Sequence, residues 1–237
     1  MATPHLSAQD LEDIERAVRA AEVRTTGEIY CVVAEESSDY HAVPLAWAAG
    51  VALLAPAVLL LGGIQVSAPD MGMFGGWSAE QVEDIGEATA RAALIGTLML
   101  QGLLFLVTLF VVSIHPVRRA LTPRGLKRDR VRQRAEEQFL AKNLSATRDR
   151  TGVLIYVSFA ERMAELIADE SIHAKVPDGT WDQAMAALVA GLRHGRPAAG
   201  FTEAIQLCAN LLADNFPARM GDNPNELPDA VVVLPRA

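Results

Sequence analysis

The sequence predicts an α/β fold in which helices flank a small mixed β-sheet, with a transmembrane α-helical hairpin inserted into the domain. Residues 28–34 and 153–159 are almost continuously apolar and rich in β-branched side chains, which is typical of strands buried on both faces. Residues 40–69 and 92–117 contain no Asp, Glu, Lys or Arg, and each stretch can cross the ~30 Å apolar core of a bilayer as a helix. These stretches explain the positive mean hydropathy of +0.19 in a chain of 237 residues with a net charge of −8.

We therefore expect three consecutive segments. Residues 1–43 and 118–237 should be the two parts of one α/β domain, because the N-terminal part alone is too short to bury a core. Residues 44–117 should be the transmembrane hairpin between them. The hairpin is expected to contain two helices and an external loop, at about residues 44–66, 92–114 and 67–91.

The N-terminal part should begin with a helix. Ser7 and Asp10 form a capping-box pattern, and apolar residues recur at helical spacing as far as residues 25–27. The strand at 28–34 follows. A crossover leads from it to the strand at 153–159, which predicts that these two strands are parallel.

The C-terminal part supplies the rest of the domain. Val131, Ala135 and Phe139 form an apolar stripe on a helix at about residues 125–143. A short turn follows the strand at 153–159, so Met163–Ala168 should be a third, antiparallel strand.

Two further helices and an edge strand are expected near the C-terminal end of the chain. Thr180 should cap the first of these helices, and residues 195–200 should form a hinge before the second. The second helix should end at residues 216–217, and residues 231–234 should add an edge strand.

The distribution of Lys and Arg predicts the orientation of the hairpin. Residues 67–90 contain several acidic residues and no Lys or Arg, whereas the stretch after the second apolar segment is strongly basic. Its basic residues are Arg118, Arg119, Arg124, Lys127, Arg128, Arg130, Arg132 and Arg134. We therefore expect a multi-pass protein of the inner (plasma) membrane with both termini in the cytoplasm. The same basic stretch can contact anionic headgroups of the bilayer. No nucleic-acid partner is expected for a chain with a pI of about 5.1.

Several classes of chemistry have no motif in the sequence. Cys31 and Cys208 lie in apolar runs, so we expect buried thiols rather than a disulfide or metal ligands. The chain contains no Walker loop, nucleophile elbow, zinc motif or dinucleotide-binding fingerprint. No cleavable signal peptide is expected, because residues 1–10 lack a basic segment followed by an apolar one.

The densest polar cluster follows the third predicted strand and contains Asp169, Glu170 and His173. Two adjacent carboxylates on an extended chain point in different directions, which favours a solvated strand end over a metal site. His173 has the chemistry of a general base, but the sequence places no nucleophile beside it. Arg193 and Arg196 could hold a phosphate, although a surface role is the simpler interpretation.

Four motifs follow one another in a characteristic order. They are Thr26-Gly27-Glu28-Ile29, residues 151–162, the helix from Gly200-Phe201 to Phe216-Pro217, and residues 225–229. Together they resemble the TPM domain, a family named for thylakoid lumen, photosystem II repair and acetylcholine-receptor accessory proteins. The resemblance covers roughly residues 5–40 and 125–235, and it is most similar to the bacterial branch of membrane proteins with a hairpin inside the domain. It implies an α/β sandwich.

The resemblance also implies candidate activities. Some TPM proteins are described as weak acid phosphatases or Ca²⁺ binders, and others as non-catalytic partners of membrane complexes. Typical members carry an acidic, Gly-rich loop before the Gly-Val-Leu strand. Here that place is occupied by residues 148–152, in which Asp149 is the only acidic residue and has an arginine on each side. This departure counts against a bound cation, so no cofactor is expected, with Ca²⁺ or Mg²⁺ left open.

We therefore expect a membrane-anchored, non-catalytic interaction or assembly module on the cytoplasmic face. Its partners would be the lipid bilayer and another membrane protein or a second copy of the chain. The alternative is a weak metal-dependent phosphatase, a phosphoester hydrolase that would depend on Asp149 or Asp169. A channel or transporter is disfavoured because the two apolar segments carry no charged residue.

Overall fold

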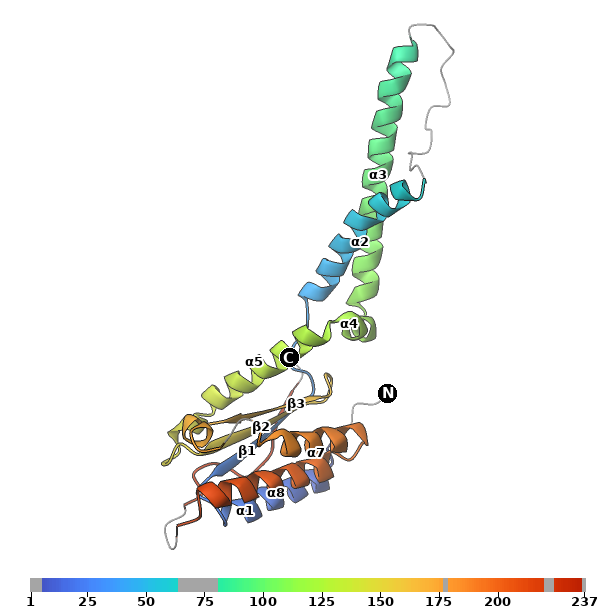
Figure 1. Ribbon diagram of the computed structural model, residues 1–237. Helices are drawn as coiled ribbons and strands as arrows, with labels where there is room; N and C mark the ends of the chain where they lie inside the picture. The colour runs from blue at the N-terminus through green and yellow to red at the C-terminus, as the bar shows by residue number, and fades with distance from the viewer. Residues whose placement is uncertain (1–5, 64–80, 177–178, 220–223, 236–237) are drawn as a thin grey trace. The chain divides into compact units, whose positions relative to one another are not determined.

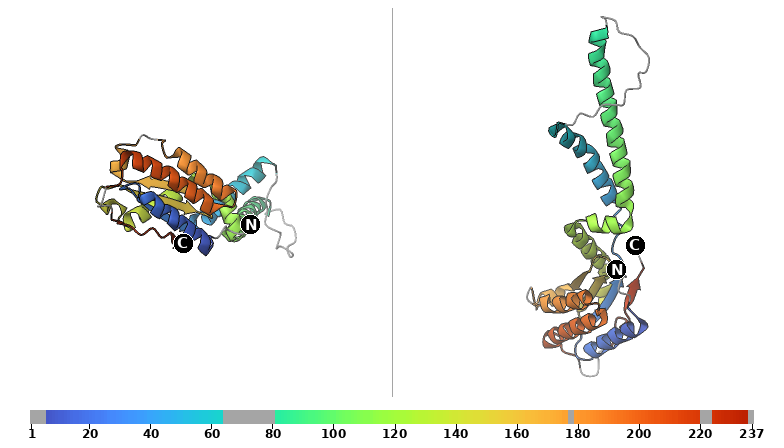
Figure 2. Two further views of the ribbon diagram at one scale, coloured as in Figure 1. Left: turned by 90° about the horizontal axis from the view of Figure 1, so that it is seen from below. Right: turned by 90° about the vertical axis from the view of Figure 1, so that its right-hand side faces the viewer.

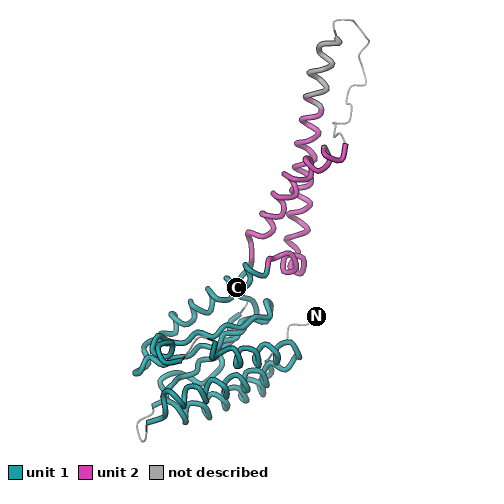
Figure 3. Tube along the Cα trace, in the orientation of Figure 1, with its two compact units in different colours: residues 1–39, 124–237 teal, residues 40–123 magenta. Residues whose placement is uncertain are grey.

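The computed structural model describes residues 6–63, 81–176, 179–219 and 224–235. The chain divides into two compact units, which are residues 1–39 with 124–237 and residues 40–123 (Figure 3). The first unit contains α1 (Ala8–Glu22), β1 (Glu28–Ala34), α5 (Arg124–Ala141), η1 (Leu144–Ala146), β2 (Gly152–Ser158), β3 (Met163–Ala168), α6 (Glu170–His173), α7 (Asp182–Arg193), α8 (Pro197–Asn215) and β4 (Val232–Leu234). The second unit contains α2 (Ala42–Leu61), α3 (Gln81–Ser113) and α4 (His115–Leu121).

The first unit is built on a four-stranded mixed sheet with the strand order β3-β2-β1-β4 (Figure 1). β1 pairs in parallel with β2 along its whole length, from Glu28 opposite Gly152 to Ala34 opposite Ser158. β4 pairs in parallel with the other side of β1, and β3 pairs antiparallel with β2. The predicted mixed sheet, with its parallel crossover, antiparallel third strand and C-terminal edge strand, is confirmed.

Helices cover both faces of this sheet (Figure 2). On one face, alternate residues of β1 and β2 pack against α1 and α8, around Phe201, Ile205 and Leu212. On the other face, Tyr30 and the intervening residues pack under α5. The predicted stripe of Val131, Ala135 and Phe139 is buried there. Because both faces are covered, every residue of β1 and β2 is buried, as their apolar sequences predicted.

The predicted start of α1 and the predicted burial of the thiols are also confirmed. The Ser7 hydroxyl accepts a hydrogen bond from the Asp10 backbone N–H at 3.1 Å, and the Asp10 carboxylate accepts one from the Ser7 N–H at 2.8 Å. Cys31 and Cys208 are free and buried in the core between β1 and α8. Burial raises the pKa of the Cys31 thiol, and it raises the pKa of Cys208 to about 12, so both thiols are unreactive in the folded chain.

The predictions for α7 and for the hinge were wrong in detail. α7 starts at Asp182 with Trp181 as its N-cap and no side-chain cap, so Thr180 does not cap it. α8 already starts at Pro197, a residue that suits the first turn of a helix, so the expected hinge is much shorter. Gly200 lies inside α8 against Gly191 of α7, where a Cβ on Gly191 would stand 2.5 Å from the Gly200 Cα. The two helices therefore cross at backbone contact.

The second unit contains two long apolar helices. α2 has Pro56 in its interior, and α3 runs without interruption for 33 residues. Within the expected loop, Ser78 and Gln81 form a capping-box pattern that predicts a short helix running from Ala79 into the second apolar segment. Residues 81–91 are indeed helical and belong to α3. The remainder of the expected loop, with Ser78, lies outside the described residues. By length and composition, Ala42–Leu59 and Ala93–Ser113 could each cross a membrane.

Candidate functional site

Two threonine–glycine pairs join β1 and β2 at the end of the sheet where both strands begin. The Thr151 hydroxyl donates to the Thr26 carbonyl at 2.9 Å, and the Glu28 N–H donates to the Thr151 carbonyl at 3.1 Å. A Cβ on Gly152 would stand 2.5 Å from the Leu144 carbonyl oxygen, and one on Gly27 would stand 2.9 Å from a Leu212 methyl carbon. Glycine is therefore required at position 152, where the obstacle is backbone, whereas at position 27 it gives room to the Leu212 side chain.

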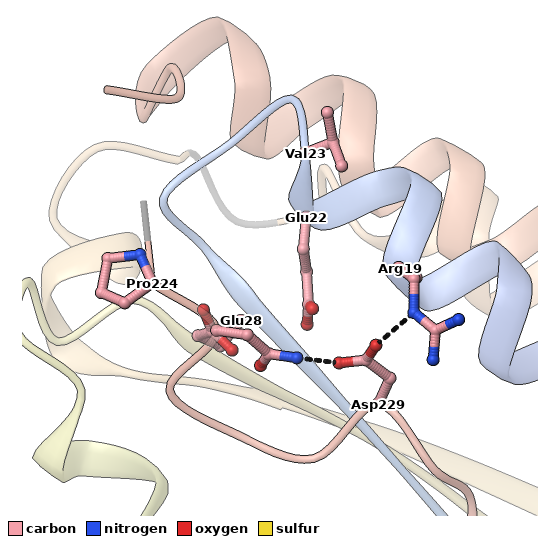
Figure 4. A pocket seen from close by; sticks show the side chains of 7 residues that line it. Arg19, Glu22, Val23, Glu28, Pro224 and Asp229 are labelled. Carbon is pink, nitrogen blue, oxygen red and sulfur yellow. Dashed lines mark hydrogen bonds and ion pairs between the residues drawn. The ribbon is translucent and has the colours of Figure 1, made fainter. Parts of the chain in front are cut away.

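Three buried carboxylates converge beside this junction on a pocket of about 250 Å³ (Figure 4). Glu22 comes from the last turn of α1, Glu28 begins β1, and Asp229 lies in the C-terminal segment just before β4. Each of the three residues is less than 10% exposed. We call this group the acidic cluster; Arg19 and Asn225 also line its pocket.

Donors of the chain itself satisfy the acidic cluster. The Glu22 carboxylate accepts a hydrogen bond from the Ile29 N–H at 2.9 Å, and the Glu28 carboxylate accepts one from the Leu227 N–H at 3.1 Å. The Asp229 carboxylate accepts hydrogen bonds from Arg19 Nε at 3.0 Å and from Asn225 Nδ2 at 2.5 Å. These bonds fasten the C-terminal segment to both α1 and β1.

Burial makes two members of this cluster, Glu22 and Glu28, resist ionisation. It raises the pKa of Glu22 to about 8, against the opposing effect of the hydrogen bond from Ile29. The neighbouring carboxylates of Glu28 and Asp229 add to this rise. Burial also raises the pKa of Glu28, again partly offset by the backbone N–H of Leu227. At neutral pH the Glu22 carboxyl therefore holds a proton, which limits the repulsion among three carboxyl groups near one arginine.

Asp149 lies next to the acidic cluster, in a second pocket that shares Glu28 and Pro224 with the first. Arg219 Nη2 approaches both Asp149 carboxylate oxygens, at 2.6 and 2.7 Å. The Glu226 carboxylate accepts a hydrogen bond from the Arg148 N–H at 2.7 Å. These contacts tie the turn before β2 to the C-terminal segment.

The residues of this site do not fit a Ca²⁺ or Mg²⁺ ion. Such ions need several carboxylate or carbonyl oxygens around one position, but the guanidinium of Arg219 takes both oxygens of Asp149. Within the described ranges, no group of three or more His, Cys, Asp or Glu side chains is arranged to hold a metal ion. The carboxylate of Asp149 is thus engaged by Arg219.

Comparison with protein-family models finds a domain match within the chain. Residues 112–211 match the family model of the TPM domain. The chain carries a TPM domain. The matched residues run from the end of α3 into α8, and the structure completes the TPM sheet with β1 and β4 from outside the match.

The structural comparison agrees with this assignment at the level of the fold. The NMR structure of the BA42 protein from the psychrophilic bacterium Bizionia argentinensis matches with a TM-score of 0.53 and 18% sequence identity. The match covers 96% of this chain and 94% of that chain. No curated protein matches the sequence. At 18% identity the likeness to BA42 shows the shared fold alone.

The structure does not bring the predicted polar residues together at the acidic cluster. Asp169 is not on a solvated strand end: it is buried and N-caps α6, where its Oδ1 accepts a hydrogen bond from the Glu170 N–H at 2.6 Å. Glu170 and His173 lie on that short helix with exposed side chains. The segment is helical because Ile172 is buried in the core.

Arg193 and Arg196 are exposed and lie at the α7–α8 connection, away from the acidic cluster in the fold. Between them, the His194 ring Nδ1 lies 2.7 Å from the Ala190 carbonyl oxygen, and its N–H would donate to the end of α7, as expected for a residue at a helix C-terminus. Of the predicted site residues, Asp149 alone lines the pockets beside the acidic cluster.

Glu22→Gln should remove much of the pH dependence of stability. In the folded chain the pKa of Glu22 lies above its ordinary value of 4.5, so the folded state binds more protons than the unfolded state up to about pH 8. Stability should therefore fall as the pH rises from about 4.5 to 8. Glutamine keeps the acceptor for the Ile29 N–H without the titration. Thermal unfolding measured between pH 5 and 9 should show a flatter profile for the variant and a higher melting temperature at pH 8–9.

Glu12→Gln is the matched control, because Glu12 lies on the same helix with an exposed side chain. In Glu12→Gln the melting temperature should depend on pH as in the wild type. In Glu22→Gln a smaller dependence should remain, because the pKa of Glu28 is also raised. Identical pH profiles for wild type and Glu22→Gln would contradict the assigned role of Glu22.

Proposed function

We propose that this TPM-domain protein is a membrane-anchored, non-catalytic interaction module on the cytoplasmic face of the inner membrane. The observation that carries the proposal is that the carboxylates at the amino ends of β1 and β2 are used internally. Asp149, Glu226, Glu28 and Asp229 each bind a donor on another segment of the chain. Such a site holds the domain together, because donors of the chain itself engage these carboxylates.

The surface of the second unit supports membrane anchoring. Large apolar side chains on α2 and α3 are exposed, with Leu61 at 90% and Phe110 at 74% exposure. A contiguous apolar surface of this kind would be unstable in water and is stabilised in lipid. The acidic residues between the two apolar segments and the basic residues after them support an orientation with α5 in the cytoplasm.

The free edge of β4 supports a protein partner. Among the described strands, β4 is the last in the sheet and pairs with β1 alone. Val233, in its centre, is 53% exposed. An extended segment of another membrane protein, or of a second copy, could add a strand there through backbone hydrogen bonds.

Cysteine labelling in intact cells tests the topology. A Ser145→Cys variant should resist a membrane-impermeant maleimide, and a Ser78→Cys variant should react with it. Cys31 and Cys208 are buried, so the background should be low. Labelling of Ser145→Cys before the cells are opened would refute the cytoplasmic placement.

Photo-cross-linking in native membranes tests the partner surface. A photoreactive residue introduced at Val233 should give a defined cross-linked product with another membrane protein or a second copy. The same residue at Val23 is the control, because Val23 is also an exposed valine, at 72%, but lies at the end of α1. Equal products from the two positions would remove the support for a docking edge on β4.

Turnover assays separate this proposal from the alternative, a weak metal-dependent phosphatase. The purified full-length protein should hydrolyse no generic phosphoester above background, with or without millimolar Ca²⁺ or Mg²⁺. Neither ion should raise its melting temperature, because Arg219 already neutralises Asp149. Hydrolysis that is lost in Asp149→Asn or Asp169→Asn would favour the phosphatase.

A further inference from the structure

The opposite end of the sheet holds a second polar pocket. β1 ends at Ala34 and β2 ends at Ser158. The Phe159 N–H donates to the Ala34 carbonyl at 3.0 Å, so the segments that follow the two strands begin side by side. In sheets with parallel strands, ligands bind beyond the carboxyl ends of those strands. Here that position is a pocket of about 230 Å³ between the segment after β1 and one side of α5. It is lined by Ser37, Ser38, Asp39, Arg130, Gln133, Arg134 and Glu137.

Buried hydrogen bonds fix the wall of this pocket. The Ser37 hydroxyl lies 3.0 Å from the Tyr156 hydroxyl, and the Ser37 N–H donates to both Glu161 carboxylate oxygens at 3.3 and 3.4 Å. Glu161 also accepts a hydrogen bond from the Ser158 hydroxyl. Ser37 is only 6% exposed. The segment that faces α5 is therefore held in place before any ligand binds.

Two guanidinium groups lie on the α5 side of the pocket. Arg130 and Arg134 are one helical turn apart and so project from the same side of the helix. Arg130 Nη1 donates to the neutral amide oxygen of Gln133 at 3.0 Å, and Arg134 Nη1 donates to the Glu137 carboxylate at 3.0 Å. Arg134 is thus ion-paired with a carboxylate, whereas Arg130 contacts a neutral amide.

The charge around the pocket favours an anion. Glu137 is held by Arg134 and also accepts a hydrogen bond from Gln133 Nε2 at 3.3 Å. The N-terminal part of α5, residues 124–134, contains Asp129 as its one acidic residue. Its basic residues are Arg124, Lys127, Arg128, Arg130, Arg132 and Arg134. In the pocket lining, Arg130 and Arg134 balance Asp39 and Glu137, and the other basic residues of α5 add positive charge beside the pocket.

We propose that this pocket binds a phosphate group, with Arg130 and Arg134 as its charged donors. Planar guanidinium groups bind phosphate oxygens in pairs, which a diffuse basic surface does not do. The phosphate could belong to a lipid headgroup or to a small phosphate in solution. All lining residues belong to the first unit, so the inference does not depend on membrane anchoring.

The test compares arginine variants that remove the same charge from the same helix. Arg134 and Arg132 are each ion-paired with a glutamate on the next turn, at 3.0 Å, but only Arg134 lines the pocket. The full-length protein in phosphatidylcholine nanodiscs is titrated with inorganic phosphate by calorimetry. In parallel, native mass spectrometry counts phosphatidic acid retained from nanodiscs that contain it. Arg134→Gln should weaken binding about tenfold, and Arg132→Gln should change it less than about twofold.

A pair of glutamate variants gives the opposite effect. Glu137→Gln frees Arg134 and removes a repulsive charge at the pocket, so it should strengthen phosphate binding several-fold. Glu136→Gln, which frees Arg132 outside the pocket, should not. All four side chains lie on the outer surface of α5, and circular dichroism should show an unchanged fold.

Each outcome decides the proposal. Phosphate binding that depends on Arg134 supports a soluble ligand, and retention of phosphatidic acid without phosphate binding supports a lipid headgroup. Either result upholds a phosphate site. Equal effects of Arg134→Gln and Arg132→Gln would show diffuse attraction and overturn it, as would equal effects of the two glutamate variants. Failure of the wild-type protein to bind either probe would also overturn it.

Discussion

The parallel pairing of β1 with β2 is the constraint on which the rest of this structure depends. The two strands are separated in sequence by all of the second unit and α5, yet they pair along their whole length. Closing so long a connection costs little more than closing a short one, because the entropy cost grows only with the logarithm of its length. The pairing must still be specific, and the two threonine–glycine pairs provide that specificity. A side chain at Gly152 would collide with the Leu144 backbone in η1, and one at Gly27 would press on the Leu212 side chain of α8.

The acidic cluster lies beside the start of the paired strands β1 and β2. Burying three carboxyl groups near one arginine is unfavourable, and burial raises the pKa values of Glu22 and Glu28 as a result. What the arrangement achieves is attachment of the C-terminal segment, since Leu227 and Asp229 bind β1 and α1 directly. β4 follows within a few residues and completes the sheet. The buried carboxyl groups thus help to hold β4, one of the two edge strands of the sheet.

The sequence predicted the architecture better than the site, for a physical reason. Strands buried on both faces and the apolar stripe of α5 are local patterns, and each was found where it was expected. The acidic cluster is not local. Glu22 reads as an ordinary helix end and Asp229 as part of a polar tail, until pairing of β4 brings them together. The partner of Asp149 could not be predicted either, because Arg219 lies 70 residues further along the chain. The prediction that Asp169 lies at a solvated strand end was wrong for a local reason. Ile172 is buried in the core, and the segment around it forms the short helix α6.

The two ends of the sheet now differ in a way that bears on function. At the amino ends of β1 and β2, the carboxylates are bound by donors of the chain itself. These donors are a backbone N–H of the C-terminal segment and the guanidinium groups of Arg19 and Arg219. At the carboxyl ends, buried hydrogen bonds fix the wall through Ser37, while Arg130 faces the pocket with a neutral partner. The carboxyl end is also where parallel strands place ligands in other α/β proteins. The carboxylates of the acidic cluster are bound by internal donors, whereas Arg130 and Arg134 line the pocket beside α5. If this TPM domain binds a ligand within its own fold, the pocket beside α5 is therefore a better candidate than the acidic cluster.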